Sequence, residues 1–342
     1  MSYETGTSTG ANDLIDKLRV FLLADSWTVN LWADDGTGKR LHVQKTAGDS
    51  TVMYFNFRSA VNEKGSTITG DNVNSEGYGN VTGILVNGST GYDVGESWDK
   101  QPGYGQNAAS QSYACAISPV SLTAIPSYYF FSVNDTVSIV VEITSGKFQF
   151  MSFGLLEKQG TFTGGQFFTA SMSSGEPAKD WTGYDYKNQY VPRYLSLSGY
   201  AGYDLVQGAV YVNADSVASW RRCSETAEYP IAFSCVSGQR ATPNTSFGTY
   251  SKRAFCSMFY AKSPSAYNAM AAMAPAYVFL KRTDLNYSLI GWPSGVRCLN
   301  VTQYDPGQEL TYGDETWLVF HNNGINDTPV NLYAGFAFKK VV

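Results

Sequence analysis

Apolar and polar residues alternate along the segment from Thr136 to Ser171, and this alternation is the clearest structural signal in the chain. Ile139, Val141 and Ile143 recur at every second position, which is the period of a half-buried strand. Ser145-Gly146 predicts a two-residue turn, because glycine readily adopts a positive φ. A second strand is expected to begin directly after this turn, so the segment predicts a β-hairpin.

The two-residue turn also predicts how the hairpin strands pair. It places Thr144 opposite Lys147 and, further along, Val141 opposite Phe150. One face then carries five apolar side chains, which are Ile139, Val141, Ile143, Phe148 and Phe150. The other face is polar near the turn and gains apolar residues further away, at Val140, Met151 and Phe153. We therefore expect the base of the hairpin to be covered on both sides, by this chain or by a neighbouring subunit.

A helical pattern spans residues 12–24, after a small and polar segment that predicts an extended arm over residues 1–10. Asn12 is the expected N-cap, and Asp13 lies in the first turn, where a negative charge is favourable. Apolar residues form a single stripe along this helix. A lone amphipathic helix beside a β-rich body either covers a sheet or docks on a neighbour. We assign docking and take four residues as the candidate assembly interface, namely Leu14, Leu18, Phe21 and Leu22.

The rest of the pattern predicts a mainly β protein with antiparallel, sandwich-like sheets and a few short helices. Strands are expected at residues 27–32, 41–44, 51–57, 83–86, 124–133, 166–170, 277–280, 296–301, 316–320 and 330–338. Short helices are expected at residues 215–222 and 263–273, the second beginning at Ser263-Pro264. A turn-rich region near residue 175 predicts three parts: an arm and docking helix (1–25), a β-rich domain (26–175) and a second β-rich domain (176–342).

The composition suits this architecture. Charged residues make up only 15% of the chain and aromatic residues another 15%, with 24 tyrosines. Interface cores are enriched in Tyr and Trp and depleted in charge, so such a chain is suited to burial against other subunits. A β-rich protein with a large aromatic core explains the same composition equally well.

Charge and hydropathy argue against several classes of function. The net charge is −5 and no Lys/Arg-rich run occurs, which argues against nucleic-acid binding. No stretch approaches the roughly 18–20 apolar residues of a membrane span. The first ten residues lack the basic and apolar parts of a secretory signal, so we expect cytoplasmic assembly. The cysteines are odd in number and are then expected to be reduced thiols, at Cys115, Cys223, Cys235, Cys256 and Cys298.

No motif predicts catalysis, a cofactor or a metal site. The two histidines, His42 and His321, lack ligand-type neighbours at metal-binding spacing. His42 is expected to be structural, and His321 is expected to be a strand-end or surface histidine. A Gly-x-Ser-x-Gly elbow is missing from the sequence. Residues 36–39 (GTGK) lack the spacing of a phosphate loop and predict a turn. We therefore expect a protein that is not an enzyme, although paired carboxylates for sugar hydrolysis converge only in space and stay open as an alternative.

The densest aromatic stretch runs from Trp181 to Tyr203. Such residues stack on sugars, but they also fill cores and subunit interfaces, and we favour the second interpretation. The candidate glycan or subunit contacts are Trp181, Tyr184, Tyr186 and Tyr190.

Several segments together resemble virion structural proteins of tailed bacteriophages. They are the opening MSYETGT, the DLIDKLRVFL helix, GYDVGESWDKQPGYG, the hairpin YYFFSVNDTVSIVVEITSGKFQFMSFGLLEKQG, TGGQFF and the closing VNLYAGFAFKKV. The resemblance spans most of the chain in order and is least at residues 176–290. It implies a role in the tail, neck (collar) or baseplate, with other virion proteins and copies of the chain itself as partners. It carries no catalytic residue over to this chain.

The sequence therefore predicts a virion component that assembles in the host bacterial cytoplasm through protein–protein interfaces. A head decoration protein is a variant of this hypothesis. The first alternative is a receptor-recognition protein that binds host-surface glycan through its aromatic stretch. The second is a polysaccharide depolymerase.

Overall fold

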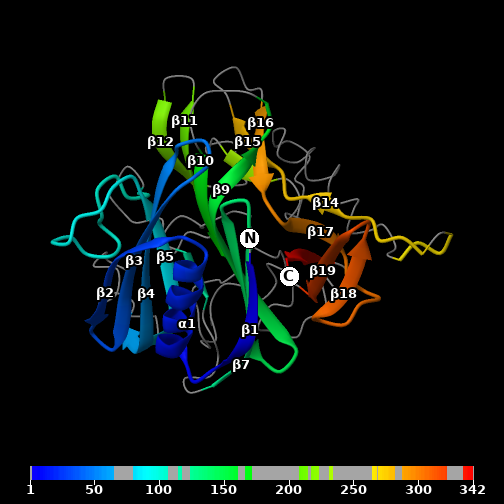
Figure 1. Ribbon diagram of the computed structural model, residues 1–342, viewed down its shortest axis with the longest axis horizontal. Coiled ribbons are helices and arrows are strands. Elements are labelled where there is room, and N and C mark those ends of the chain that lie inside the picture. The colour runs from blue at the N-terminus through cyan, green and yellow to red at the C-terminus, as the bar shows by residue number, and fades with distance from the viewer. Residues whose placement is uncertain are drawn as a thin grey trace, which may run out of the picture.

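The structure is a computed structural model that describes residues 2–64, 80–106, 115–117, 124–160, 166–171, 208–214, 217–222, 231–233, 264–267, 269–281, 287–321 and 334–341. Within these residues the protein is mainly β, with one helix and several antiparallel sheets in a sandwich-like arrangement (Figure 1). This confirms the predicted fold class. The predicted short helices are wrong in the described part, because Val217–Arg222 is a strand and residues 269–273 are not helical.

The central sheet is built around the hairpin. Its strands follow the order β1 (Ser2–Ser8), β7 (Ile125–Val133), β8 (Thr136–Thr144), β9 (Lys147–Lys158), β10 (Gln166–Ser171), β11 (Gly208–Ala214) and β12 (Val217–Arg222). Beside these, the C-terminal end of β9 pairs with β16 (Tyr287–Pro293), which continues to β15 (Val278–Lys281) and β13 (Ile231–Phe233). The expected N-terminal arm is thus strand β1, which is hydrogen-bonded along β7.

Two further sheets flank the central sheet on either side in Figure 1. The N-terminal sheet has the order β2 (Thr28–Asp35), β3 (Gly38–Thr46), β4 (Val52–Lys64), β5 (Asn80–Ser89) and β6 (Cys115–Ile117). The C-terminal sheet has the order β14 (Ala274–Pro275), β17 (Val296–Asn300), β20 (Ala334–Lys340), β19 (Glu315–His321) and β18 (Gln308–Tyr312). The central sheet therefore has a hydrophobic core on each of its two faces.

The hairpin β8–β9 departs from the predicted register. Thr144 lies opposite Lys147 as expected, but a bulge between Glu142 and Thr144 shifts the pairing, so that Val140 lies opposite Phe150. The prediction that Val141 and Phe150 share a face is wrong, because one extra residue moves all later side chains to the other face. The expectation that the hairpin is covered on both sides is confirmed, and this chain itself provides both covers.

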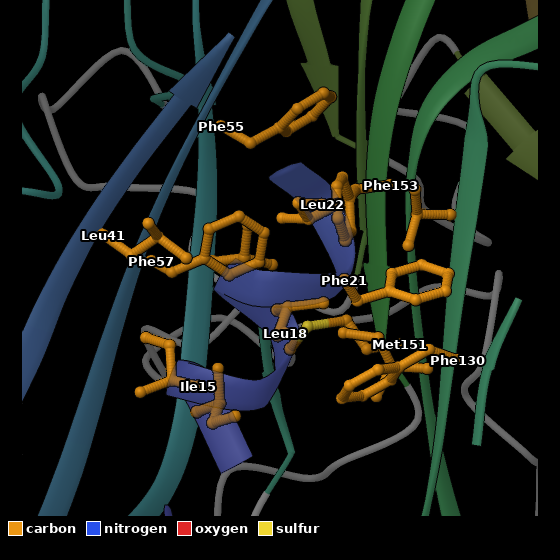
Figure 2. Close-up of a cluster of buried hydrophobic side chains, with 14 of the residues drawn as sticks. Ile15, Leu18, Phe21, Leu22, Leu41, Phe55, Phe57, Phe130, Met151 and Phe153 are labelled. Carbon is orange, nitrogen blue, oxygen red and sulfur yellow. The ribbon is translucent and has the colours of Figure 1, made fainter. Parts of the chain in front are cut away.

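The first core lies between the N-terminal and central sheets and contains helix α1 (Ala11–Ala24) (Figure 2). Phe21 of the helix meets Phe130 of β7 with ring centroids 5.4 Å apart. Phe55 of β4 meets Phe153 of β9 at 5.0 Å. The helix begins one residue before the prediction, with Gly10 rather than Asn12 at the N-cap. This core fixes the N-terminal sheet on the central sheet.

The second core lies between the other face of the central sheet and the C-terminal sheet. Phe131 of β7 stacks on Phe338 of β20 at 5.3 Å, and Phe150 of β9 contacts Phe336 at 5.7 Å. Strands β9, β10 and β11 also hydrogen-bond continuously across residue 175. The predicted boundary at 175 therefore separates neither two sheets nor two cores in the described part of the chain.

Candidate functional site

The helical stripe that we predicted as an assembly interface lies inside the chain. The exposed fractions of Leu14, Leu18, Phe21 and Leu22 are 0%, 0%, 3% and 0%. These side chains pack against residues of both the N-terminal and the central sheet, as Figure 2 shows for Leu18, Phe21 and Leu22. The assignment to an assembly interface is corrected, because an apolar stripe already covered by its own sheets offers no surface to a neighbour.

The predicted glycan or subunit contacts Trp181, Tyr184, Tyr186 and Tyr190 lie outside the described residues. They stay predictions. A different aromatic residue, Trp220 of β12, lies beside the N-terminal sheet and donates a hydrogen bond from Nε1 to the carbonyl oxygen of Gly103 (2.7 Å).

The most elaborate polar arrangement in the described residues lies on the outer face of the N-terminal sheet, beneath the loop at residues 90–106. Gln101 organises this loop from within and is fully buried. Its Nε2 donates to the carbonyl oxygens of Asp93 (2.9 Å), Glu96 (3.0 Å) and Ser97 (3.1 Å). Its Oε1 accepts from the backbone N–H of Asp93 (2.8 Å). One side chain thus holds the loop in a single conformation.

Two residues tie the loop to the sheet. Asn87 of β5 donates from Nδ2 to the carbonyl oxygen of Gly105 (3.2 Å), and Arg40 of β3 donates to that of Glu96 (3.1 Å). Trp98, which belongs to the loop, has only 1% of its surface exposed. The loop is therefore an integral cover of this face.

His42 of β3 lies under this cover and is 1% exposed. Its Nδ1 is 2.7 Å from Oδ1 of Asn56. The Nδ2 of Asn56 donates to Ser89 Oγ (2.9 Å) and to the carbonyl oxygen of Asn87 (3.4 Å), which fixes the orientation of the amide. His42 Nδ1 therefore carries the proton, and Nε2 is a buried acceptor without a hydrogen-bond partner in the described residues.

Burial lowers the pKa of His42, the hydrogen bond with Asn56 raises it by less, and the charge of Arg40 adds a smaller lowering effect, so that the pKa is about 4. The imidazole is thus neutral at pH 7. The expectation that His42 is structural agrees with this geometry. His321, at the end of β19, likewise hydrogen-bonds through Nε2 to the carbonyl oxygen of Tyr304.

A buried ion pair between Arg58 and Glu63 of β4 lies next to the β2–β3 turn of the same sheet. Arg58, 2% exposed, donates from Nη2 to Oε1 of Glu63 (2.8 Å) and from Nη1 to its Oε2 (3.0 Å). Burial raises the pKa of Glu63, but hydrogen bonds from Arg58 and Thr37 outweigh this effect and lower it. Both groups are charged and mutually satisfied, so the predicted GTGK turn is anchored structurally.

A second charged cluster joins α1, β3 and β7. Asp25, after α1, accepts hydrogen bonds from Ser132 Oγ of β7 (2.6 Å) and Lys45 Nζ of β3 (3.2 Å). Lys45 also pairs with Asp135 (3.1 Å). Burial raises the pKa of Asp25, but the hydrogen bond from Ser132 and the charge of Lys45 lower it below the ordinary value. This cluster connects the helix to two sheets and is internal to the fold.

In the described part of the chain, three or more His, Cys, Asp or Glu side chains nowhere come together as a metal site. Helix α1 has 14 residues, and no described helix is long and apolar enough to span a membrane.

No family model matches the chain, and no curated protein matches it.

Sequence reasoning missed the loop at 90–106 as an ordered element. The partners of Gln101 are only four to eight residues away, but an internal glutamine bonded to backbone carbonyls has no recognisable motif. The available signal was Trp98, a large apolar residue in a loop rich in glycine and charged residues, which indicates that the loop packs onto a surface.

Proposed function

We propose that this chain is a structural component of a tailed-phage virion, in the tail, neck or baseplate, and that it acts through protein–protein interfaces. The observation that carries the proposal is the position of the segments that resemble phage structural proteins. Strands β1, β7, β8, β9 and β10, which contain three of these segments, are consecutive neighbours in the central sheet. The resemblance thus follows one folded unit.

Two further resembling segments cover the two faces of that unit. Helix α1 packs on one face of the central sheet, and β20 packs on the other. The segment at residues 91–105 forms the ordered loop over the N-terminal sheet. The resembling segments thus include the central sheet and the elements that cover both of its faces. This supports an architecture shared with phage structural proteins more strongly than scattered surface motifs would.

The architecture also suits a rigid part of a particle. Both faces of the hairpin are buried, and the charged cluster at Asp25 connects α1 with β3 and β7. Such a body presents its loops and edges to neighbours without needing to fold on binding, which reduces the entropy cost of assembly.

Mass spectrometry of purified phage particles tests the proposal. We expect the chain at a stoichiometry similar to that of known particle components, and we expect it to stay with the particles through a density gradient and a high-salt wash. Recovery of the chain only in the soluble fraction of the lysate would refute the proposal.

A further inference from the structure

His42 is a titratable side chain enclosed between strand β3 and the loop at residues 90–106. It is 1% exposed, and its ring meets the ring of Tyr92, a residue of the loop, with centroids 5.3 Å apart. Its Nδ1 faces Oδ1 of Asn56, and its Nε2 has no hydrogen-bond partner in the described residues. The site therefore suits a neutral imidazole, and among the described residues it offers a protonated one no acceptor for its second N–H.

The charged groups around His42 do not compensate a positive charge on its ring. Arg40, on the same strand, lowers the pKa of His42, whereas Asp35 at the end of β2 raises it by less. The carboxylate of Asp35 is already paired with Arg58 of β4 (3.2 Å). The loop adds Asp93, Glu96, Asp99 and Lys100, and His42 hydrogen-bonds to none of them. Protonation of His42 would thus place an uncompensated charge beneath the loop, which is unfavourable.

Of the two elements that enclose His42, the loop is attached less firmly than the strand. Strand β3 is hydrogen-bonded along both of its edges, to β2 and to β4. The loop is attached by the side-chain hydrogen bonds of Asn87, Arg40 and Trp220 described above. It is also attached by the backbone N–H of Gly105, which donates to the carbonyl oxygen of Gly88 in β5 (2.9 Å). In Figure 1 the loop (cyan) projects from one end of the molecule. Segments of this kind open at a lower free energy than the sheet beneath them.

We propose that loop 90–106 is an acid-released cover, which lifts from the N-terminal sheet when His42 becomes protonated. Lifting gives the imidazolium water as a hydrogen-bond partner and lets water screen it from Arg40. The loop keeps its own conformation, because the side chain of Gln101 bonds only within it. Trp98 becomes accessible, so the chain offers an aromatic surface in acid that it hides at neutral pH. This device is independent of the proposed role in a virion.

The linkage between protonation and opening sets the size of the effect. The pKa of His42 is about 4 with the loop closed, and the ordinary value of 6.5 applies once the loop is open. The open state therefore binds the proton more tightly, and the equilibrium constant for opening rises as the pH falls below 6.5. From about pH 7 to about pH 4 the rise is about 100-fold, of which about 20-fold is reached at about pH 5.

Hydrogen exchange of the Gly105 amide in the full chain tests the device, because this N–H is bonded to β5 only while the loop is closed. After correction for the intrinsic exchange rate at each pH, we expect exchange in the wild type to accelerate by about 100-fold from about pH 7 to about pH 4. Low concentrations of urea should leave it unchanged, as for a local opening. His42→Asn does not titrate and is expected to abolish the acceleration. His321→Asn, at the other histidine, is the matched control and is expected to keep it.

Equal acceleration in the wild type and in His42→Asn would overturn the proposal. So would exchange at Gly105 that increases with urea as steeply as exchange in β4, because the loop would then open only with the whole fold. If His42→Asn does not fold, the wild type alone decides. Most carboxylates are still charged at about pH 5, so an acceleration of about 20-fold by that pH supports the proposal and a flat profile refutes it. None of these outcomes bears on particle composition, so failure of the cover and failure of the proposed function are distinguishable.

Discussion

His42 links the protonation of one buried side chain to the stability of the fold. Its pKa is about 4 in the folded protein against 6.5 for an ordinary histidine, so the unfolded chain binds the proton more tightly. Stability from this group is fully present above the unfolded pKa and is lost as the pH falls toward the folded pKa. A shift of this size corresponds to about 3 kcal/mol between about pH 7 and about pH 4.

We expect His42→Asn to remove this component of the pH dependence. The Asn amide can still donate to Asn56, but it does not titrate. Denaturant unfolding at several pH values should show that wild type loses about 3 kcal/mol more free energy of unfolding than the variant over this range. Carboxylates such as Asp25 and Glu63 lose their contribution at lower pH in both proteins and cancel in the difference. Equal losses in both proteins would contradict the burial of His42.

Gln101 makes a second prediction at the same scale. Gln101→Glu replaces an amide donor by a carboxylate that faces three carbonyl oxygens, so we expect the unfolding free energy to fall by about 1–3 kcal/mol at neutral pH. Limited proteolysis should cut the variant faster within residues 90–106. Gln159→Glu, at an exposed glutamine, is the matched control and should leave cleavage of the loop unchanged. Similar behaviour of the two variants would show that Gln101 does not hold the loop.

Single residues were the part of the site that sequence could not predict. His42 was correctly expected on a strand, but its partner Asn56 lies 14 residues away on the next strand. Which polar side chains meet across a sheet depends on register, and register is a property of the folded pair rather than of either segment. The lowered pKa of His42 follows from its burial among these neighbours and has no sequence signature of its own.

At the scale of elements, helix α1 carries the clearest expectation. Leu18 is fully buried between two sheets, whereas Val20, two residues along, is 51% exposed. Leu18→Ala should lower the free energy of unfolding by about 2–5 kcal/mol, since it removes buried methyl groups and leaves a cavity. Val20→Ala is the control on the same helix and should change it by less than about 0.5 kcal/mol. Equal effects would contradict the orientation of the helix.

The same geometry predicts the effect of removing the N-terminus. Deleting residues 1–24 removes both β1 and α1. Because the loss of α1 exposes the first core, we expect the truncated protein to be insoluble or unfolded. A soluble truncated chain with native circular dichroism would instead support a helix that docks on a neighbour.

The elements show where sequence patterns reach their limit. The 3.6-residue period correctly predicted the apolar stripe of α1, but it could not say what covers the stripe. The prediction of the turn at Ser145-Gly146 was also correct. The bulge beside Ile143 was missed because no glycine or proline marks it in the sequence. At the β7–β8 turn, Asn134 and Asp135 adopt φ values of 47° and 64°. Two residues with positive φ are typical of a type I′ hairpin turn, and their identity was a usable signal.

At the scale of the whole molecule, the structure makes the two halves of the chain depend on each other. Sequence composition suggested a linker near residue 175, but pairing between distant strands such as β9 and β16 crosses that position. Such long-range pairing leaves no local trace in composition. The predicted sandwich-like β class was nevertheless correct. The alternation of apolar and polar residues within each strand indicates the fold class, but it does not indicate which strands pair.

We expect the three sheets to unfold together. Hydrogen exchange under increasing denaturant should show strands β4 and β19, from the two flanking sheets, losing protection in one transition. Loss of protection in β19 at a clearly lower denaturant concentration than in β4 would indicate two independently stable parts.

A cryo-EM map of the intact particle tests the assignment to a virion most directly. The proposal predicts repeated density in the tail, neck or baseplate that fits the three-sheet body. A map in which every protein density of these regions is occupied by other chains would contradict it.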